Sequence, residues 1–167
     1  MYQTILMDPP WNERGGGKIK RGADRHYPLL KTREMPRVIY QSGVWRPALN
    51  AHLYMWATNN FLPDALWLLG SLGFTYKTNV VWTKSRAGLG QYFRGQHELL
   101  LFGVCGSGPA ARTSRRDLCS VIQAPRTRHS AKPEAAYQLI EARSQAPRLE
   151  MFARAAREGW DAWGNES

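Results

Sequence analysis

The amino-acid sequence predicts an α/β fold with a mostly parallel, doubly wound sheet. Short apolar segments alternate with segments of helical spacing, and several of the apolar segments are hydrophobic at successive positions, as strands covered on both faces are. The chain has 167 residues, of which 43% are hydrophobic, so it is long enough for one well-filled core and short for two. We therefore expect a single domain over residues 1–167.

Five segments have the composition of buried strands. They are TILMD (4–8), AHLYMWA (51–57), TNVVWTK (78–84), HELLLFGV (97–104) and RLEMFA (148–153). Two further segments have helical spacing. Pro63 to Leu72 is followed by Gly73, and Pro133 to Ala142 begins with proline and glutamate, which favour a first helical turn. Helices that lie between strands favour parallel pairing of those strands.

The charge of the chain indicates a polyanionic partner. Lys and Arg number 23 against 13 Asp and Glu, which gives a formal net charge of +10. The basic residues gather in three predicted loops: Arg14, Lys18, Lys20, Arg21 and Arg25; Arg112, Arg115 and Arg116; Arg126, Arg128 and Lys132. A solvated basic surface would also explain such runs, but three runs in loops favour nucleic acid.

Several other classes of protein are disfavoured. Cys105 and Cys119 are fourteen positions apart, and two cysteines provide neither a disulfide framework nor a four-ligand zinc site, so we expect no metal. No apolar run approaches the roughly twenty residues that span a bilayer, and the N-terminus does not have the pattern of a signal peptide. We expect a soluble protein of the reducing cytoplasm, without a membrane partner.

The stretch ILMDPPWNE (5–13) marks the candidate site. A buried strand ends at Asp8, and ligands of open α/β sheets bind outside the carboxyl ends of the strands. Pro9 and Pro10 fix the backbone and present carbonyl acceptors, while Trp11 offers a flat ring. These groups suit an amino group on an aromatic base. The alternative is that Asp8 caps a turn, the prolines stiffen a loop and Trp11 belongs to the core.

Further segments make a family recognisable. Beside DPPW (8–11) they are HYP (26–28), NVVWTK (79–84), YFRGQHELLLFGV (92–104), HSAKPEAAYQLIE (129–141), LEMFAR (149–154) and GWDAWGNE (159–166). In this order the chain resembles the adenine amino methyltransferases with an Asp-Pro-Pro-Trp motif, the family named after the seventy-kilodalton MT-A subunit of the eukaryotic messenger-RNA adenosine methyltransferase. The resemblance is strongest to the short bacterial and phage members, and it covers nearly the whole chain.

The resemblance implies a Rossmann-like methyltransferase fold with a permuted motif order, which uses S-adenosylmethionine. Asp8 and the Pro9 carbonyl would hold the N6 amino group of adenine, Pro10 would shape the pocket, and Trp11 would stack near the base. The methyl group would pass directly to nitrogen without a covalent enzyme intermediate. Related enzymes carry asparagine at the position of Asp8, which implies a positioned acceptor and not an obligatory base.

The resemblance also implies cofactor-binding and substrate-binding residues. The cofactor set is Asp8, Lys84, Phe152, Arg154, Asn165 and Glu166. The substrate set is Trp11, Tyr27, Lys18, Lys20 and Arg21. Apart from the resemblance, Lys84 reads as a solvated strand end and Arg154 as a surface cation. His97 and Glu98 are disfavoured as an acid/base pair, because neighbouring residues on a strand point to opposite faces.

The segment 12–30, which we call the basic loop, is expected to be part of the active site. It follows the DPPW motif, contains Gly15-Gly16-Gly17 and carries five basic residues. Close approach of its backbone to phosphate is favoured by the glycines. We expect the loop to order on nucleic acid and to place Tyr27 against the target base.

Three functions remain open at this point. The first is a DNA adenine methyltransferase in the cytoplasm of a bacterial or phage-infected cell, the second is the same reaction on RNA, and the third is a non-catalytic nucleic-acid-binding subunit. DNA is favoured by the resemblance to the short bacterial and phage members. A homodimer is left open.

Overall fold

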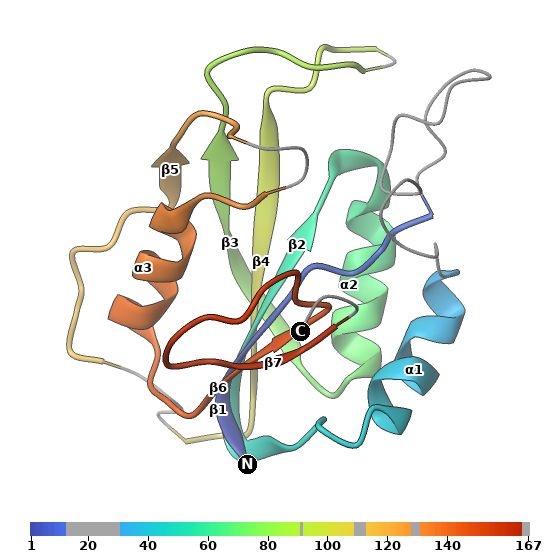
Figure 1. Ribbon diagram of the computed structural model, residues 1–167, viewed down its shortest axis with the longest axis vertical. Helices are drawn as coiled ribbons and strands as arrows, with labels where there is room; N and C mark the ends of the chain where they lie inside the picture. The colour runs from blue at the N-terminus through green and yellow to red at the C-terminus, as the bar shows by residue number, and fades with distance from the viewer. Residues whose placement is uncertain (13–30, 91, 109–112, 128–130, 165–167) are drawn as a thin grey trace.

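The computed structural model describes residues 1–12, 31–90, 92–108, 113–127 and 131–164. A seven-stranded sheet runs through these residues in the order β5-β3-β4-β2-β1-β6-β7 (Figure 1). The strands are β1 (Tyr2–Met7), β2 (Pro47–Ala57), β3 (Thr75–Thr83), β4 (His97–Cys105), β5 (Val121–Gln123), β6 (Arg148–Met151) and β7 (Asp161–Trp163). The five predicted strands are all present in this sheet.

The sheet is mostly parallel, as predicted. β1 pairs in parallel with β2 and β6, β6 pairs in parallel with β7, and β3 pairs in parallel with β5. β4 is antiparallel to both β2 and β3. A hairpin connection therefore suffices between β3 and β4, where parallel strands would need a crossover helix. β1, β2, β3 and β6 end at one edge of the sheet, which we call the carboxyl edge, and β4 begins there.

Helices cover both faces of the sheet, which confirms the doubly wound arrangement (Figure 1). α1 (Met35–Gln41) and α2 (Leu62–Ser71) pack on one face together with the side chains of Ile5 and Met7. α3 (Glu134–Arg143) packs on the other face together with Leu6. The alternation of Ile5, Leu6 and Met7 between the two cores is the consequence of strand geometry, since successive side chains point to opposite faces.

Three elements were not predicted from the sequence. They are α1, β5 and β7, and the last two have three residues each. Two short 3-10 turns, Thr32–Glu34 and Asn59–Phe61, precede α1 and α2. Within the described residues, no helix is both long and apolar enough to cross a membrane.

Candidate functional site

Asp8 stands at the carboxyl edge because of the way β1 is built into the sheet. β1 is an interior strand, and its last residue, Met7, is fully buried and paired with Met55 of β2 and Met151 of β6. The next residue is Asp8, whose side chain remains 20% exposed. A carboxylate is thus held between the ends of two neighbouring strands, at the place where open α/β sheets bind ligands.

The residues that follow Asp8 form a rigid turn. Pro9 and Pro10 are buried, and the Trp11 N–H donates to the Pro9 carbonyl over 2.8 Å. A carbonyl oxygen has two lone pairs, so that of Pro9 retains one acceptor position. The turn therefore fixes the direction of this carbonyl beside Asp8.

Trp11 is held firmly in this turn. Its indole Nε1 donates to the Trp56 carbonyl at 3.1 Å, and its ring stacks on Phe61 with a centroid separation of 5.8 Å and an interplanar angle of 16°. Only 5% of its surface is exposed. Trp11 is thus part of the core between the sheet and α2.

Asp8 belongs to a group of ionisable side chains that we call the charged cluster: Asp8, Lys84, Glu98, Lys132 and Arg154. Lys132 Nζ lies 3.5 Å from Asp8 Oδ1, and Arg154 Nη2 lies 4.0 Å from Asp8 Oδ2. Glu98 connects two lysines, with its Oε2 at 2.7 Å from Lys132 Nζ and its Oε1 at 2.6 Å from Lys84 Nζ. The cluster therefore runs as a continuous chain of contacts from Arg154 to Lys84.

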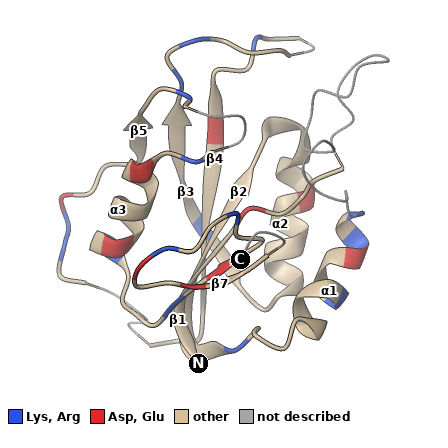
Figure 2. Ribbon diagram, viewed as in Figure 1, with Lys and Arg blue, Asp and Glu red and all other residues tan. Residues whose placement is uncertain are grey.

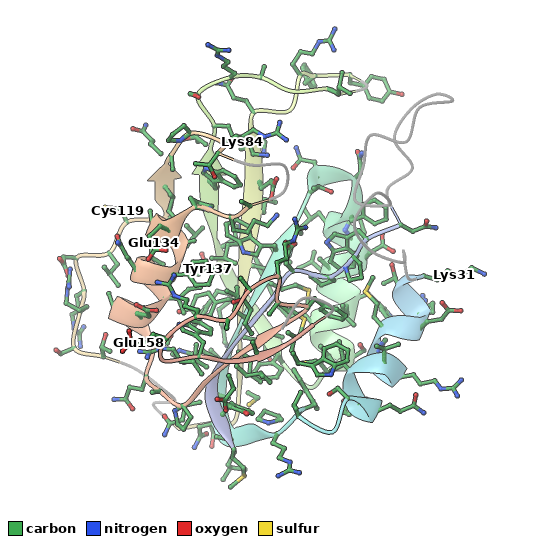
Figure 3. The ribbon with its side chains drawn as sticks, in the orientation of Figure 1. Lys31, Lys84, Cys119, Glu134, Tyr137 and Glu158 are labelled. Carbon is green, nitrogen blue, oxygen red and sulfur yellow. The ribbon has the colours of Figure 1, made fainter. Side chains whose placement is uncertain are left out.

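Four other parts of the chain bring the remaining members of the charged cluster to Asp8 at the carboxyl edge. Lys84 directly follows β3, where Figure 3 shows it, and Glu98 is the second residue of β4. Lys132 lies two residues before α3, and Arg154 lies three residues after the end of β6. The cluster is possible because β4 runs antiparallel and so begins at the edge where the other strands end.

The two carboxylates of the cluster have opposite electrostatics. Burial raises the pKa of Asp8; the Lys132 ammonium opposes this rise, and the Glu98 carboxylate adds to it. Burial also disfavours ionisation of Glu98, but Lys132 and Lys84 outweigh it and lower the pKa of Glu98 to about 2. Glu98 is therefore ionised at neutral pH. Burial, in contrast, disfavours the ionised form of Asp8. Perturbed groups of this kind gather at functional sites.

The chain turns sharply beside Asp8 at the end of β6. Phe152 has a φ of +61°, a backbone conformation that residues other than glycine rarely adopt. Its ring packs edge-on against that of Trp163, with the ring centroids 5.5 Å apart. Gly164 lies against this turn, because a Cβ on it would be 2.1 Å from the Ala153 carbonyl oxygen. Backbone strain at a strand end is common at ligand sites.

A third carboxylate, outside the charged cluster, lies behind the turn. Glu150 of β6 accepts a hydrogen bond of 2.8 Å from the hydroxyl of Tyr137, on the side of α3 that faces the sheet (Figure 3). Burial raises the pKa of Glu150, and the nearby Asp8 carboxylate raises it further. Burial and the Asp8 carboxylate thus both disfavour the ionised form of Glu150.

The structure brings some of the sequence-predicted residues together. Arg154 contacts Asp8, and Phe152 forms the adjacent turn. Lys84 reaches the site only through Glu98. The remaining predicted residues, namely Lys18, Lys20, Arg21, Tyr27, Asn165 and Glu166, lie outside the described residues.

Two members of the charged cluster were missed from the sequence. Lys132 was read only as one basic residue of a loop, although it is the cation nearest to Asp8. Glu98 was considered only together with His97, which is exposed while Glu98 faces the cluster. The sequence signal that could have identified Glu98 was its position at the start of a predicted strand. That position points to the site only if β4 is known to begin at the carboxyl edge.

The cluster has the donors and acceptors for an organic ligand. Lys132 and Arg154 suit a carboxylate, and Asp8 with the Pro9 carbonyl suits an amino group. Among the residues that the structure describes, no three His, Cys, Asp or Glu side chains are grouped as metal ligands.

Comparisons with known proteins agree with this geometry. The family model MT-A70 matches residues 2–166. The Type II methyltransferase M.MunI of Mycoplasma sp is 32% identical over 186 aligned positions, which cover 99% of this chain and 77% of the relative. Both matches extend over the sheet, the DPPW turn and the charged cluster. The chain therefore belongs to the MT-A70 family.

Proposed function

We propose that the protein transfers a methyl group from S-adenosylmethionine to the N6 amino group of adenine in DNA. The observation that carries this proposal is the placement of Asp8 at the carboxyl edge, beside the fixed Pro9 carbonyl and within 4.0 Å of two cations. The similarity to a protein named as a Type II methyltransferase supports DNA as the substrate.

Asp8 and Pro9 would act on the target amino group as a pair of acceptors. An ionised carboxylate accepts hydrogen bonds without donating any, and the carbonyl has one free lone pair. Two N–H bonds drawn toward these acceptors turn the nitrogen lone pair toward an electrophile. Since the amino nitrogen is itself the nucleophile, orientation of that nitrogen carries the rate.

Lys132 and Arg154 would keep Asp8 in its accepting form. Burial favours the protonated state of Asp8, and a protonated carboxyl group would present a donor to the amino group. The Lys132 ammonium at 3.5 Å lowers the pKa of Asp8 and so opposes protonation. We therefore assign Lys132, rather than Lys84, as the cation that acts directly on Asp8.

The residues around the β6 turn fit S-adenosylmethionine, which when bound supplies an electrophilic methyl group. Its carboxylate calls for a cation, and Arg154 is 29% exposed beside Asp8. The strained turn at Phe152 and the close packing of Gly164 against Ala153 hold this part of the backbone together beside Asp8, and Gly164 is followed in the sequence by Asn165 and Glu166. We propose that these last two residues bind the ribose and the carboxylate, as the family resemblance implies.

We propose that the basic loop binds the nucleic acid. Lys18, Lys20 and Arg21 would contact phosphates and Tyr27 the target base, because adenine must leave the base stack to reach Asp8. A DNA substrate would place the reaction in the cytoplasm of a bacterial or phage-infected cell. We leave a homodimer open as a partner.

One assay tests the reaction, the substrate and the position of the methyl group. Purified protein is incubated with labelled S-adenosylmethionine and with DNA or RNA oligonucleotides of matched sequence, and the product is digested to nucleosides. We expect N6-methyladenine from DNA. Product from RNA alone would reassign the substrate, methylcytosine would contradict the acceptor pair, and tight binding without product would indicate a non-catalytic subunit.

A further inference from the structure

The connection between β3 and β4, residues 84–96, of which the structure describes all but residue 91, is a hairpin. The Lys84 N–H donates to the Gln96 carbonyl at 2.8 Å, the Gly88 N–H to the Gly95 carbonyl at 2.6 Å, and the Gly95 N–H to the Leu89 carbonyl at 3.1 Å. The tip is tight, because a Cβ on Gly90 would lie 1.8 Å from the Phe93 carbonyl oxygen. Figure 1 shows that the hairpin extends beyond the carboxyl edge.

The hairpin presents large apolar side chains to solvent. Leu89 is 73% exposed, Tyr92 is 92% exposed and Phe93 is 89% exposed. Isolated exposed apolar residues are ordinary, but three within five residues of one tip offer a candidate contact surface. None of the three side chains belongs to the hydrophobic core on either face of the sheet.

The surroundings of the tip are basic. Residues 84–96 contain no Asp or Glu, and Arg86 and Arg94 flank the tip in the sequence. Figure 2 shows basic positions along this hairpin. Arg126 joins them, since its Nη1 lies 3.6 Å from the position of a Cβ on Gly88. Aromatic rings between guanidinium groups suit nucleic acid, whose phosphates are anionic and whose bases stack on rings.

A second copy of the chain fits this surface less well. In a two-fold symmetric contact the same patch meets itself, so that Arg86, Arg94 and Arg126 of both copies would be brought together. The formal net charge of +10 on each chain adds to this repulsion. A polyanion relieves the same charges, and the charge complementarity therefore favours nucleic acid.

The base of the hairpin is linked to the charged cluster. Lys84, its first residue, contacts Glu98, which contacts Lys132, which in turn lies beside Asp8. β3 and β1 end at the same edge, so the tip stands on the side of the molecule from which a base reaches Asp8. The hairpin is therefore placed to contact the strand around a base held at Asp8.

We propose that Tyr92 and Phe93 stack against the bases next to the extruded adenine and enter the space that it leaves, while Arg86, Arg94 and Arg126 contact the flanking phosphates of duplex DNA. This inference rests on the proposed function, because only a flipped base leaves such a space. Apolar side chains inserted between base steps restore stacking contacts that the flanking bases lose when the adenine leaves.

The test uses the full chain and the double variant Tyr92→Ser/Phe93→Ser. The matched control is Leu49→Ser, which removes a side chain that is 85% exposed near the start of β2, at the opposite edge of the sheet. Fluorescence anisotropy measures binding to a labelled duplex in which one abasic position mimics the space left by a flipped base. Thermal unfolding of each variant verifies that it folds.

We expect the double variant to bind the abasic duplex at least about tenfold more weakly than the parent, as loss of stacking implies, and Leu49→Ser to bind as the parent does. The dependence of affinity on salt should be unchanged in the double variant. The variant Arg86→Ala/Arg94→Ala/Arg126→Ala should instead reduce the slope of log K against log salt, by about 0.9 for each phosphate that the protein no longer neutralises.

Parent-like affinity of the double variant would overturn the inference. So would a change confined to self-association in sedimentation experiments, which would make the hairpin an interface between copies, or a dependence on the aromatic residues with RNA alone. The methylation assay, run in parallel, separates this inference from the proposed function. Adenine methylation with unaffected binding overturns only the hairpin contact, and aromatic-dependent DNA binding without methylation overturns only the reaction.

Discussion

Two groups of buried polar side chains lie toward opposite edges of the same sheet. The charged cluster occupies the carboxyl edge. Toward the amino ends of β1 and β6, Ser144 contacts both His52 and Tyr54, with its Oγ at 2.6 Å from His52 Nδ1 and 2.7 Å from the Tyr54 hydroxyl. We call these three residues the sealed network, because none is more than 2% exposed.

The two groups differ in what their hydrogen bonds accomplish. Ser144 directly follows α3, and its contacts tie the end of that helix to β2, so the sealed network contributes to the position of α3. In the charged cluster the side chains remain 10–29% exposed, and burial raises the pKa of Asp8 while Lys132 and Arg154 oppose that rise. Buried polar groups without access serve structure, whereas partly exposed charges with perturbed pKa values serve ligands.

This contrast implies that changes to the two groups should separate activity from stability. The largest effect is expected from Asp8→Ala. Loss of the acceptor at the reacting nitrogen should lower kcat/KM for methyl transfer by about 10³-fold, whereas the free energy of unfolding should stay equal or rise, because a desolvated charge disappears. Kinetics with labelled S-adenosylmethionine and thermal unfolding measure the two quantities.

Asp8→Asn is the matched control for this change. It retains an acceptor oxygen and should keep more activity than Asp8→Ala. If Asp8→Ala retained more than about a tenth of the parent activity, the acceptor role would be wrong.

Lys132→Met should affect both activity and stability. It removes the cation shared by Asp8 and Glu98 while it retains the length of the side chain, and loss of one partner from a buried ion pair costs about 3 kcal/mol of the free energy of unfolding. The pKa of Asp8 should rise further, so the activity of the variant should require higher pH than that of the parent. A pH–rate profile that coincides with the parent's would show that Lys132 does not act on Asp8.

Ser144→Ala should affect stability alone. It leaves the buried side chains of His52 and Tyr54 without the Ser144 hydroxyl, which should lower the free energy of unfolding by about 2 kcal/mol. Ser71→Ala is the control, because its exposed hydroxyl bonds only to the Leu68 carbonyl within α2. Denaturant unfolding compares the two variants, and a loss of methyl transfer by folded Ser144→Ala protein would remove the distinction between the two groups.

The sequence was sufficient for the parts of the fold that repeat a pattern. Apolar runs such as TILMD revealed the strands, and the DPPW motif placed Asp8 at the carboxyl edge, because both signals lie in adjacent residues. β5 and β7 were missed because three residues are too short for a periodic pattern. The direction of β4 has no local signal, since it depends on which strands lie beside it.

The charged cluster was harder to predict than the turn that contains Asp8. Glu98 and Lys132 are far from Asp8 in the sequence and meet it only through the order of the strands. The sequence allowed two interpretations of Trp11, as a ring that stacks on a base or as a core residue. The structure shows that Trp11 is packed in the core. Its proposed contact with a base stays a prediction.

The smallest expected effect is the response of stability to pH, which has opposite signs for the two carboxylates. The pKa of Glu98 is about 2 in the folded protein, against 4.5 when the group is free. Ionised Glu98 therefore contributes stability that is present above pH 4.5 and is lost as the pH falls toward 2. Glu98→Gln should be less stable than the parent by about 1 kcal/mol at neutral pH, since the amide oxygen still accepts a hydrogen bond from one of the two lysines.

Asp8→Asn should show the reverse dependence. The pKa of Asp8 is raised from 3.8, so the folded state binds its proton more tightly than the unfolded state, and the associated stability is lost as the pH rises through the folded value. The variant should match the parent below pH 3.8 and become the more stable of the two at neutral pH. Denaturant unfolding between pH 3 and 7 measures both differences. Curves that move in the same direction for both variants would show that Asp8 and Glu98 are held in the same way, and that Asp8 is stabilised like an ordinary ion-pair partner.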